Sequence, residues 1–213
     1  MTKVKFCGLS RQEDIEAVNR LQPEYIGFVF AKQSNRYVSE NRAAALKEML
    51  TPSIKAVGVF VNEEPALIAE LVEKGIIDII QLHGGEDEAY LSKLRKMTSV
   101  HIIQAFTVKA AEDILPAENS SADFILLDAG AGAGSSFDWR LAEMVKRPYF
   151  LAGGLTPENA GAAILRLRPY ALDVSSGIET EGKKDEGKMA AFMAAVRKQD
   201  KELNSKYRSD IYD

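Results

Sequence analysis

Eight short apolar runs, rich in β-branched and aromatic residues, recur along this chain at nearly even intervals. Each interval is long enough for one helix and two short loops, so the pattern indicates eight strand-and-helix units. Strands of a parallel sheet that helices cover are expected to be almost continuously apolar, as these runs are. The pattern predicts an α/β fold, a (β/α)8 TIM barrel. The predicted strands lie at residues 4–6, 25–30, 54–61, 78–82, 101–106, 124–127, 149–152 and 171–174.

The chain length favours a single domain with short loops. Barrels of this type typically have ~250 residues, whereas this chain has 213, of which 46% are hydrophobic. An open doubly wound sheet is the alternative, but no glycine-rich dinucleotide fingerprint follows the first run. We assign residues 1–198 to the barrel, which is the catalytic domain, and the mostly polar residues 199–213 to a helical extension that frays into a tail.

Composition excludes several classes of partner and site. The formal net charge of −4 offers no basic surface for nucleic acid, and no apolar stretch approaches the ~20 residues of a membrane span. The amino terminus enters the first strand without a signal peptide, so we expect a cytoplasmic protein. A single cysteine excludes an intrachain disulfide and a cysteine-built zinc site, and two histidines leave few ligands for a metal.

Helix start signals follow several of the runs. Ser10 and Glu13 have the spacing of a capping box, and Ser39 and Asp87 each precede a segment of helical periodicity. Pro116 interrupts the segment before the sixth run, where we expect a short or irregular connection.

Two reactive side chains stand where runs end, and in a barrel these strand ends carry the active site. Cys7 ends the first run beside a helix start, which favours a thiolate that acts as base or nucleophile. A small buried side chain is the alternative for Cys7. Asp128 follows the sixth run, where a carboxyl group can act as a general acid, cap a helix or bind a ligand. The two residues could flank one bound substrate.

Small residues follow the last two runs. Gly153 and Gly154 follow the seventh run, and Ser175, Ser176 and Gly177 follow the eighth. The loops after the seventh and eighth strands are the usual phosphate site of such barrels, because glycines let backbone amides approach and serine adds a donor. The sequence therefore predicts a phosphate site, with tight turns as the alternative.

Three further sequence features near the strand ends are less specific indications of a ligand site. Arg36 follows the second run and could hold a carboxylate or phosphate, although solvated loop arginines are more common. Gln81 and His83 end the fourth run, where they could form hydrogen bonds within the mouth of the barrel; a structural role is the alternative for His83. The glycine-rich residues 130–136 have the composition of a mobile loop that closes over substrate, or of a linker.

Taken in order, these strings resemble the phosphoribosylanthranilate isomerase family. Many matches in one order are more specific than any single motif. They include Lys5-Phe6-Cys7-Gly8-Leu9, Ser34-Asn35-Arg36-Tyr37-Val38, Gly58-Val59-Phe60-Val61-Asn62, Gln81-Leu82-His83-Gly84, Leu126-Leu127-Asp128, Phe137-Asp138-Trp139, Ala152-Gly153-Gly154-Leu155-Thr156-Pro157-Glu158-Asn159 and Asp173-Val174-Ser175-Ser176-Gly177-Ile178-Glu179. The stretch 132–136 lacks a lysine and a hydroxyl that the family commonly carries, and Glu181 replaces a frequent proline.

The resemblance implies a (β/α)8 barrel that catalyses the Amadori rearrangement of N-(5-phosphoribosyl)anthranilate in tryptophan biosynthesis, without cofactor or metal. It implies that Asp128 is the general acid and Cys7 the general base. It also implies that Arg36 holds the anthranilate carboxylate and that the loops after the seventh and eighth strands hold the phosphate. The partner is then a small phosphorylated substrate, and the protein is a monomer or a homodimer.

Other barrel functions are less compatible with the residues. A metal-dependent sugar-phosphate epimerase and a histidine-pathway isomerase would share the phosphate loops. The epimerase needs more histidines, however, and the isomerase uses two aspartates, one of them where Cys7 stands. A non-catalytic sugar-phosphate-binding barrel, which would be expected to have lost Cys7 or Asp128, and a related aminoaldose-phosphate isomerase are the remaining alternatives.

Overall fold

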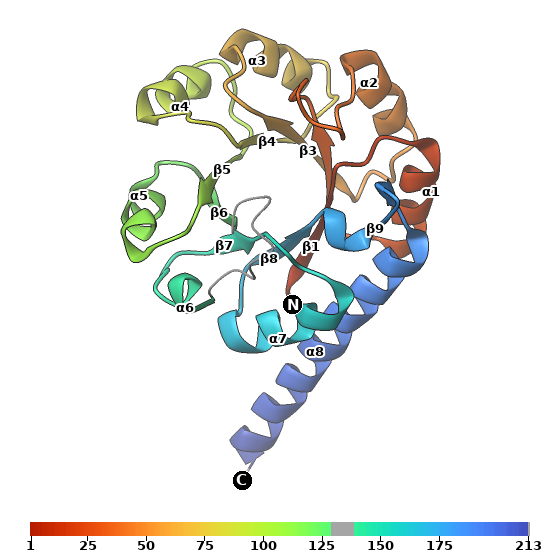
Figure 1. Cartoon of the computed structure of the whole chain (residues 1–213), viewed down its shortest axis with the longest axis vertical. Coiled ribbons are helices and arrows are strands. Elements are labelled where there is room, and N and C mark those ends of the chain that lie inside the picture. Colours follow the sequence, from red (N-terminus) through yellow and green to blue (C-terminus); the bar gives the residue numbers. More distant parts are fainter. Residues whose placement is uncertain (129–138, 213) are drawn as a thin grey trace.

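A closed barrel of parallel strands forms the centre of the molecule. The computed structural model describes the backbone of residues 1–128 and 139–212, and the side chains of these residues up to Ser205. In that part of the chain eight strands pair in chain order, and the last pairs with the first (Figure 1). Each predicted run agrees with its strand to within one residue at either end. The strands are β1 (Lys3–Cys7), β2 (Tyr25–Val29), β3 (Lys55–Phe60), β4 (Ile79–Leu82), β5 (Ile102–Thr107), β6 (Phe124–Asp128), β7 (Tyr149–Leu151) and β8 (Ala171–Val174).

Helices surround the ring and cover the outer surface of the strands (Figure 1). The helices are α1 (Gln12–Leu21), α2 (Glu40–Glu48), α3 (Pro65–Glu73), α4 (Glu88–Arg95), α5 (Ile114–Asn119), α6 (Trp139–Ala142), α7 (Pro157–Leu167) and α8 (Glu186–Tyr212), with the short 3-10 helices η1 (Ala111–Asp113) and η2 (Ser176–Ile178). A small antiparallel ribbon, β9 (Glu179–Thr180) and β10 (Lys183–Lys184), precedes α8. The short connection expected before the sixth strand is η1 and α5, and Pro116 lies in the first turn of α5, where its missing N–H costs little.

The predicted helix caps are present at two helices and differ at a third. Ser39 accepts a hydrogen bond from a backbone N–H of α2, and Asp87 does the same at α4. The expected capping box of Ser10 with Glu13 is wrong, because Asp14 takes this role. One carboxylate oxygen of Asp14 accepts from the backbone N–H groups of Ser10 and Arg11, both at 3.0 Å, so α1 begins at Gln12. Asp14 is buried, which places its carboxylate against these donors.

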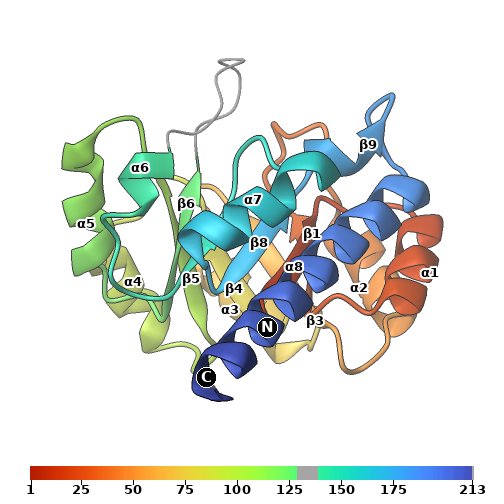
Figure 2. The same ribbon diagram turned by 90° about the horizontal axis from the view of Figure 1, so that it is seen from below.

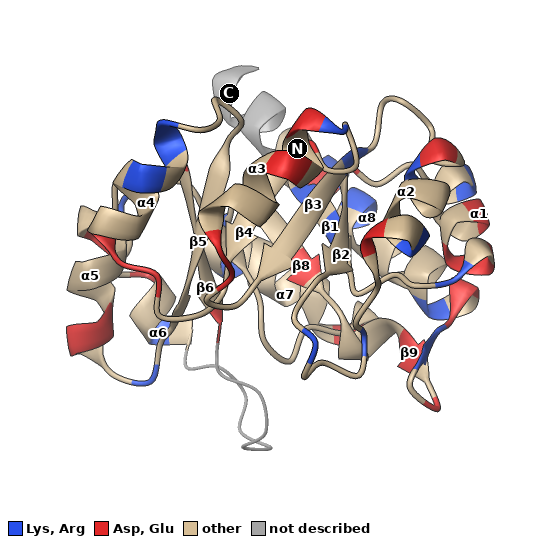
Figure 3. Ribbon diagram, turned by 90° about the horizontal axis from the view of Figure 1, so that it is seen from above, with Lys and Arg blue, Asp and Glu red and all other residues tan. Residues whose placement is uncertain are grey.

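Apolar side chains fill two regions, one inside the barrel and one between the strands and the helices. Figure 3 shows that charged residues gather on the helices and loops and are sparse on the strands. Full burial of one Ile or Phe side chain stabilises the fold by about 1.5–3 kcal/mol. The side chains inside the barrel include Tyr25, Val57, Ile79, Ile103, Leu126 and Phe150, and those outside it include Phe6, Ile26, Phe28, Ile80 and Phe192.

Helix α8, at the carboxyl-terminal end of the chain, contacts the amino-terminal end. It packs along α7 on the outside of the barrel and extends toward the end of the molecule where the amino terminus lies (Figure 2). Asp200 is buried and accepts hydrogen bonds from the backbone N–H and the hydroxyl of Thr2, both at 2.9 Å. Asp200, which follows the boundary predicted at residue 198, thus contacts the amino-terminal end of the chain. No helix in residues 1–128 or 139–212 has the length and apolar character needed to cross a membrane.

Candidate active site

Cys7 lies at the rim of the barrel, at the carboxyl end of β1. The residue after it, Gly8, has a φ of +80°, a left-handed conformation that favours glycine, and its N–H donates to the carbonyl oxygen of Gly27 at 2.9 Å. A Cβ atom on Gly27 would lie 2.7 Å from the Cys7 Sγ. Strand β2 therefore requires a glycine here, because any side chain would take the place of the thiol.

Charged groups surround the Cys7 thiol. Burial raises the pKa of the Cys7 thiol above its ordinary value. The Lys5 ammonium group opposes this effect by charge and by hydrogen bonding, and the Lys184 ammonium group also lowers the pKa. The Asp173 carboxylate acts in the same direction as burial. The thiol thus lies in a poorly hydrated place where nearby cations favour the thiolate.

Asp128 ends β6, and His83 faces it from the end of β4. The Nε2 atom of His83 lies 3.4 Å from the Asp128 Oδ2, and its Nδ1 lies 3.1 Å from the Nε2 of Gln81. When the Gln81 amide donates to Nδ1, a neutral His83 carries its proton on Nε2, directed at Asp128. Gln81 is buried, and its Oε1 has no partner within the described residues. The two mouth residues predicted at the end of β4 thus form one chain of contacts with the carboxyl group that ends β6.

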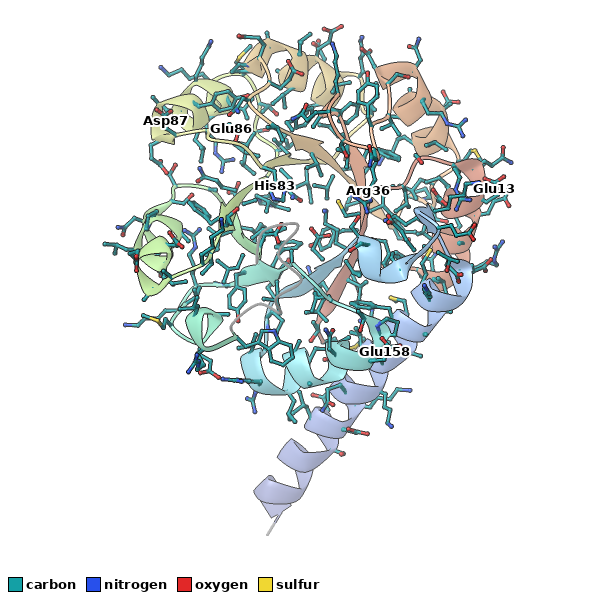
Figure 4. All side chains as sticks on the ribbon, in the orientation of Figure 1. Glu13, Arg36, His83, Glu86, Asp87 and Glu158 are labelled. Atoms are coloured by element: carbon teal, nitrogen blue, oxygen red, sulfur yellow. The ribbon has the colours of Figure 1, made fainter. Side chains whose placement is uncertain are left out.

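Arg36 reaches over the rim from the loop after β2 and is held in place by Glu179. Its Nε and Nη2 atoms donate to the two Glu179 carboxylate oxygens, each at 2.7 Å. The aliphatic part of Arg36 covers Gly8, where a Cβ atom would lie 2.4 Å from the Arg36 Cδ. Figure 4 shows Arg36 and His83 toward the inside of the ring, whereas Glu13 and Glu158 lie on its outside. Within the described residues the Arg36 Nη1 atom has no hydrogen-bond partner, so its protons can serve a ligand carboxylate.

Glu179 also connects Arg36 to the loop after β8. Burial acts against the Glu179 carboxylate, but hydrogen bonds from Arg36 and Lys184 outweigh it and lower the pKa of Glu179. The Lys184 Nζ lies 2.6 Å from the Glu179 Oε1 and donates to the backbone oxygen of Ser175 at 2.9 Å. The Ser175 hydroxyl in turn donates to the backbone oxygen of Cys7 at 3.0 Å. One network thus links the arginine, the serine loop and the end of β1.

The two loops predicted to bind phosphate lie against each other. Gly153 and Gly154 have φ values of +85° and +65°, a left-handed backbone conformation in which a residue with a side chain would be strained. A Cβ atom on Gly177 would lie 1.8 Å from the carbonyl oxygen of Leu155, so the loop after β8 touches the loop after β7. Helix α7 begins at Pro157, immediately after these residues. The arrangement joins two loops of small residues near a helix start, as an anion site requires.

Some functional candidates were missed by the sequence analysis, and one lies outside the described residues. The roles of Lys5, Asp173, Glu179 and Lys184 depend on pairing between distant segments, which strand patterns do not reveal. The loop 130–136, predicted to close over substrate, belongs to the residues that the structure does not describe. Within the described residues, no three His, Cys, Asp or Glu side chains are grouped as a metal site would require.

Comparisons with known proteins point to one family. Residues 4–195 match the family model described as N-(5'phosphoribosyl)anthranilate (PRA) isomerase. The N-(5'-phosphoribosyl)anthranilate isomerase of Acetivibrio thermocellus is 43% identical over 214 residues, covering 94% of this chain and 98% of that protein.

Solved structures agree with the sequence relatives. The phosphoribosyl anthranilate isomerase of Thermotoga maritima is similar with a TM-score of 0.85 and 36% identity, covering 92% of this chain and 99% of that one. That enzyme is also described as dimeric. A second similar structure is a phosphoribosyl anthranilate isomerase in complex with reduced 1-(o-carboxyphenylamino)-1-deoxyribulose 5-phosphate, with a TM-score of 0.82, 35% identity and coverage of 92% and 99%.

Proposed function

This chain belongs to the N-(5'-phosphoribosyl)anthranilate isomerase family, and we propose that Cys7 and Asp128 carry out the proton transfers of its reaction. The enzyme converts N-(5'-phosphoribosyl)anthranilate to 1-(2-carboxyphenylamino)-1-deoxyribulose 5-phosphate in tryptophan biosynthesis. The observation that carries the proposal is the position of a thiol and a carboxyl group at the carboxyl ends of β1 and β6, on one rim of the barrel. Two strands separate them along the shorter arc of the ring, so a substrate between them can contact both.

The chemistry needs an acid first and a base second. Protonated Asp128 gives its proton to the furanose ring oxygen, and the C1–O bond breaks to leave an iminium group at C1. The Cys7 thiolate then removes the proton from C2, and the electrons of that C–H bond form a C1–C2 double bond while neutralising the iminium nitrogen. The resulting enolamine tautomerises to the ketone. The iminium acidifies the C2 proton, which puts it within reach of a thiolate base.

Activity of the intact chain tests this assignment. N-(5'-phosphoribosyl)anthranilate is prepared immediately before use, and its fluorescence is followed after the purified protein is added. A rapid decay that depends on enzyme concentration is expected. A folded protein that produced no decay would contradict the assigned substrate.

Arg36 is proposed to bind the anthranilate carboxylate of the substrate. Replacement of Arg36 by Ala should raise KM by about tenfold to a hundredfold with a smaller change in kcat, because a charge-assisted hydrogen-bonded pair contributes about 1.5–3 kcal/mol. Steady-state kinetics measure both constants. Arg36→Lys is the matched control: it keeps the charge but not the two-pronged contact with Glu179, and should give an intermediate KM. An unchanged KM in Arg36→Ala would leave Arg36 with a structural role alone.

The loops after β7 and β8, with Gly153, Gly154, Ser175, Ser176 and Gly177, are proposed to bind the substrate phosphate. Gly177→Ala should push these loops apart, because the new Cβ would lie 1.8 Å from the Leu155 oxygen. We expect KM to rise by about tenfold or more through lost hydrogen bonds to phosphate, and inhibition by inorganic phosphate to weaken.

A glycine in the adjacent helix provides the control for that substitution. Gly161 lies within α7, and a Cβ atom there would meet its nearest neighbour, the Gln199 Oε1, at 3.4 Å. Gly161→Ala should leave KM unchanged and stabilise the helix by about 0.5–1 kcal/mol. Equal KM values for the two alanine variants would rule out a phosphate role for the loop at Gly177.

The assembly, location and extent of the catalytic unit are further parts of the proposal. We expect a cytoplasmic monomer or homodimer whose catalytic barrel comprises residues 1–198. The dimeric state described for the Thermotoga maritima relative supports the second of these forms. Sedimentation equilibrium of the full chain distinguishes the mass of one chain, 23.4 kDa, from twice that mass.

A further inference from the structure

A buried ion pair lies inside the barrel beneath the rim that carries Cys7. The Lys5 Nζ lies 3.1 and 3.0 Å from the two carboxylate oxygens of Asp173, and the two residues are opposite each other in the pairing of β1 with β8. Lys5 is fully buried and Asp173 is 7% exposed. Desolvation of two charges is costly, and apolar residues of similar volume often stabilise a core as well or better. Stability alone therefore does not explain why an ion pair is buried here, and we look for its role in function.

The position of Lys5 relative to Cys7 supplies that explanation. The two residues are separated by one residue of β1, so both side chains point to the same face of the strand, into the barrel. A Cβ atom on Gly27 would lie 2.7 Å from the Cys7 Sγ and 3.2 Å from the Lys5 Nζ. The thiol and the ammonium group thus both border one glycine of the neighbouring strand, and a hydrogen bond between them contributes to the pKa of each. An ammonium group has three protons, and the Asp173 carboxylate needs two of them, so one remains for the sulfur.

The charge state of Lys5 is maintained by its partners. Burial lowers the pKa of Lys5, but the charges of Asp173 and Cys7 and their hydrogen bonds outweigh burial, so the pKa lies above its ordinary value. At neutral pH the ammonium form therefore persists in a place that would otherwise favour the neutral amine. Lys184 and Arg36 are the other cations near the Cys7 thiol, and Asp173 is the nearby anion.

We propose that Lys5, held by Asp173, is a positioning residue that favours the thiolate form of the Cys7 sulfur by donating a hydrogen bond from within the barrel. This inference rests on the proposed role of Cys7 as the general base. Asp173 has two effects in this arrangement. It keeps Lys5 charged, and it competes with the sulfur for the same ammonium group. Removal of Lys5 and removal of Asp173 should therefore affect the thiol in opposite directions.

The chain contains one cysteine, so alkylation by iodoacetamide reports on Cys7 alone. The rate of alkylation of the full chain is measured against pH, and its midpoint gives the pKa of the thiol without any need for turnover. Lys5→Met should raise the midpoint by about one pH unit or more, since the loss of an adjacent opposite charge has effects of that size. Asp173→Asn should lower the midpoint, because the sulfur no longer competes with a carboxylate.

Two further variants separate this effect from damage to the fold. Lys5→Met combined with Asp173→Asn removes both charges and leaves no unpaired ion in the core, so its midpoint should lie above that of Asp173→Asn and below that of Lys5→Met. Lys3→Met changes another inward-facing lysine of β1, whose ammonium group contacts Tyr170 and Tyr25 instead, and should leave the midpoint unchanged. Circular dichroism establishes that each variant is folded.

The outcomes distinguish the inference from the proposed function. One break in the kcat/KM profile should shift together with the alkylation midpoint in each variant, whereas a structural role would lower activity equally at every pH. Equal midpoints in the folded double variant and in Asp173→Asn would overturn the role of Lys5. Full activity of Cys7→Ser would instead overturn the role of Cys7 as the base, whatever the midpoints show.

Discussion

Cys7→Ser is expected to reduce kcat by about 10²–10⁴-fold, the range over which a general base contributes to a proton transfer. A serine hydroxyl occupies nearly the same place as the thiol but is not deprotonated near neutral pH, so it cannot accept the C2 proton. The loss should be confined to the chemical step, because the groups proposed to hold the carboxylate and the phosphate lie on other strands and loops. Fluorescence decay of the substrate measures kcat directly.

Binding of a product analogue provides the control for this variant. Reduced 1-(o-carboxyphenylamino)-1-deoxyribulose 5-phosphate is bound by one of the similar enzymes, and it requires no proton transfer to bind. Its Kd for Cys7→Ser should stay close to that of the unmodified enzyme, which would assign the loss to catalysis. Turnover comparable to that of the unmodified enzyme would remove Cys7 from the mechanism.

The fold could be predicted from the sequence because a parallel barrel leaves a strong local signature. Every strand is buried on both faces, so each one appears as an apolar run bounded by polar residues. Lys5, the charged member of the first run, did not disturb the pattern, since the residues on either side of it pack outward against the helices. The capping box of α1 was mispredicted because Asp14, a buried acid inside the helix, accepts the backbone hydrogen bonds that were expected to go to Glu13.

The candidate site could be predicted in part. Residues at strand ends, such as Cys7, Asp128 and Gly177, are found by counting along the chain, because the topology places all strand ends on one rim. The groups that hold them are not found in this way. Arg36 and Glu179 are 143 residues apart, and Lys5 and Asp173 are 168 residues apart. Nothing local distinguishes these partners from ordinary surface or core residues.

Asp128→Asn is the second substitution for which we expect a large effect, a fall in kcat of about 10²–10⁴-fold. An amide has nearly the shape of a carboxyl group but cannot give up a proton to the ring oxygen, so ring opening loses its acid. Fluorescence decay of the substrate, followed for Asp128→Asn and for the unmodified enzyme, measures this loss. Equal decay rates for the two enzymes would remove Asp128 from the mechanism.

A substitution of His83 separates the role of the proton donor from the role of the residue that contacts it. His83→Gln removes the contact of 3.4 Å with Asp128 but leaves the carboxyl group in place, so the loss of kcat should be smaller than in Asp128→Asn. Because the two residues would act as one unit, the double variant should be no slower than Asp128→Asn alone. If Asp128→Asn kept most of its activity while His83→Gln lost it, the proton donor would be His83. The His83 Nε2 lies only 3.4 Å from the Asp128 Oδ2, so this result would keep the site and exchange the residue that serves as the acid.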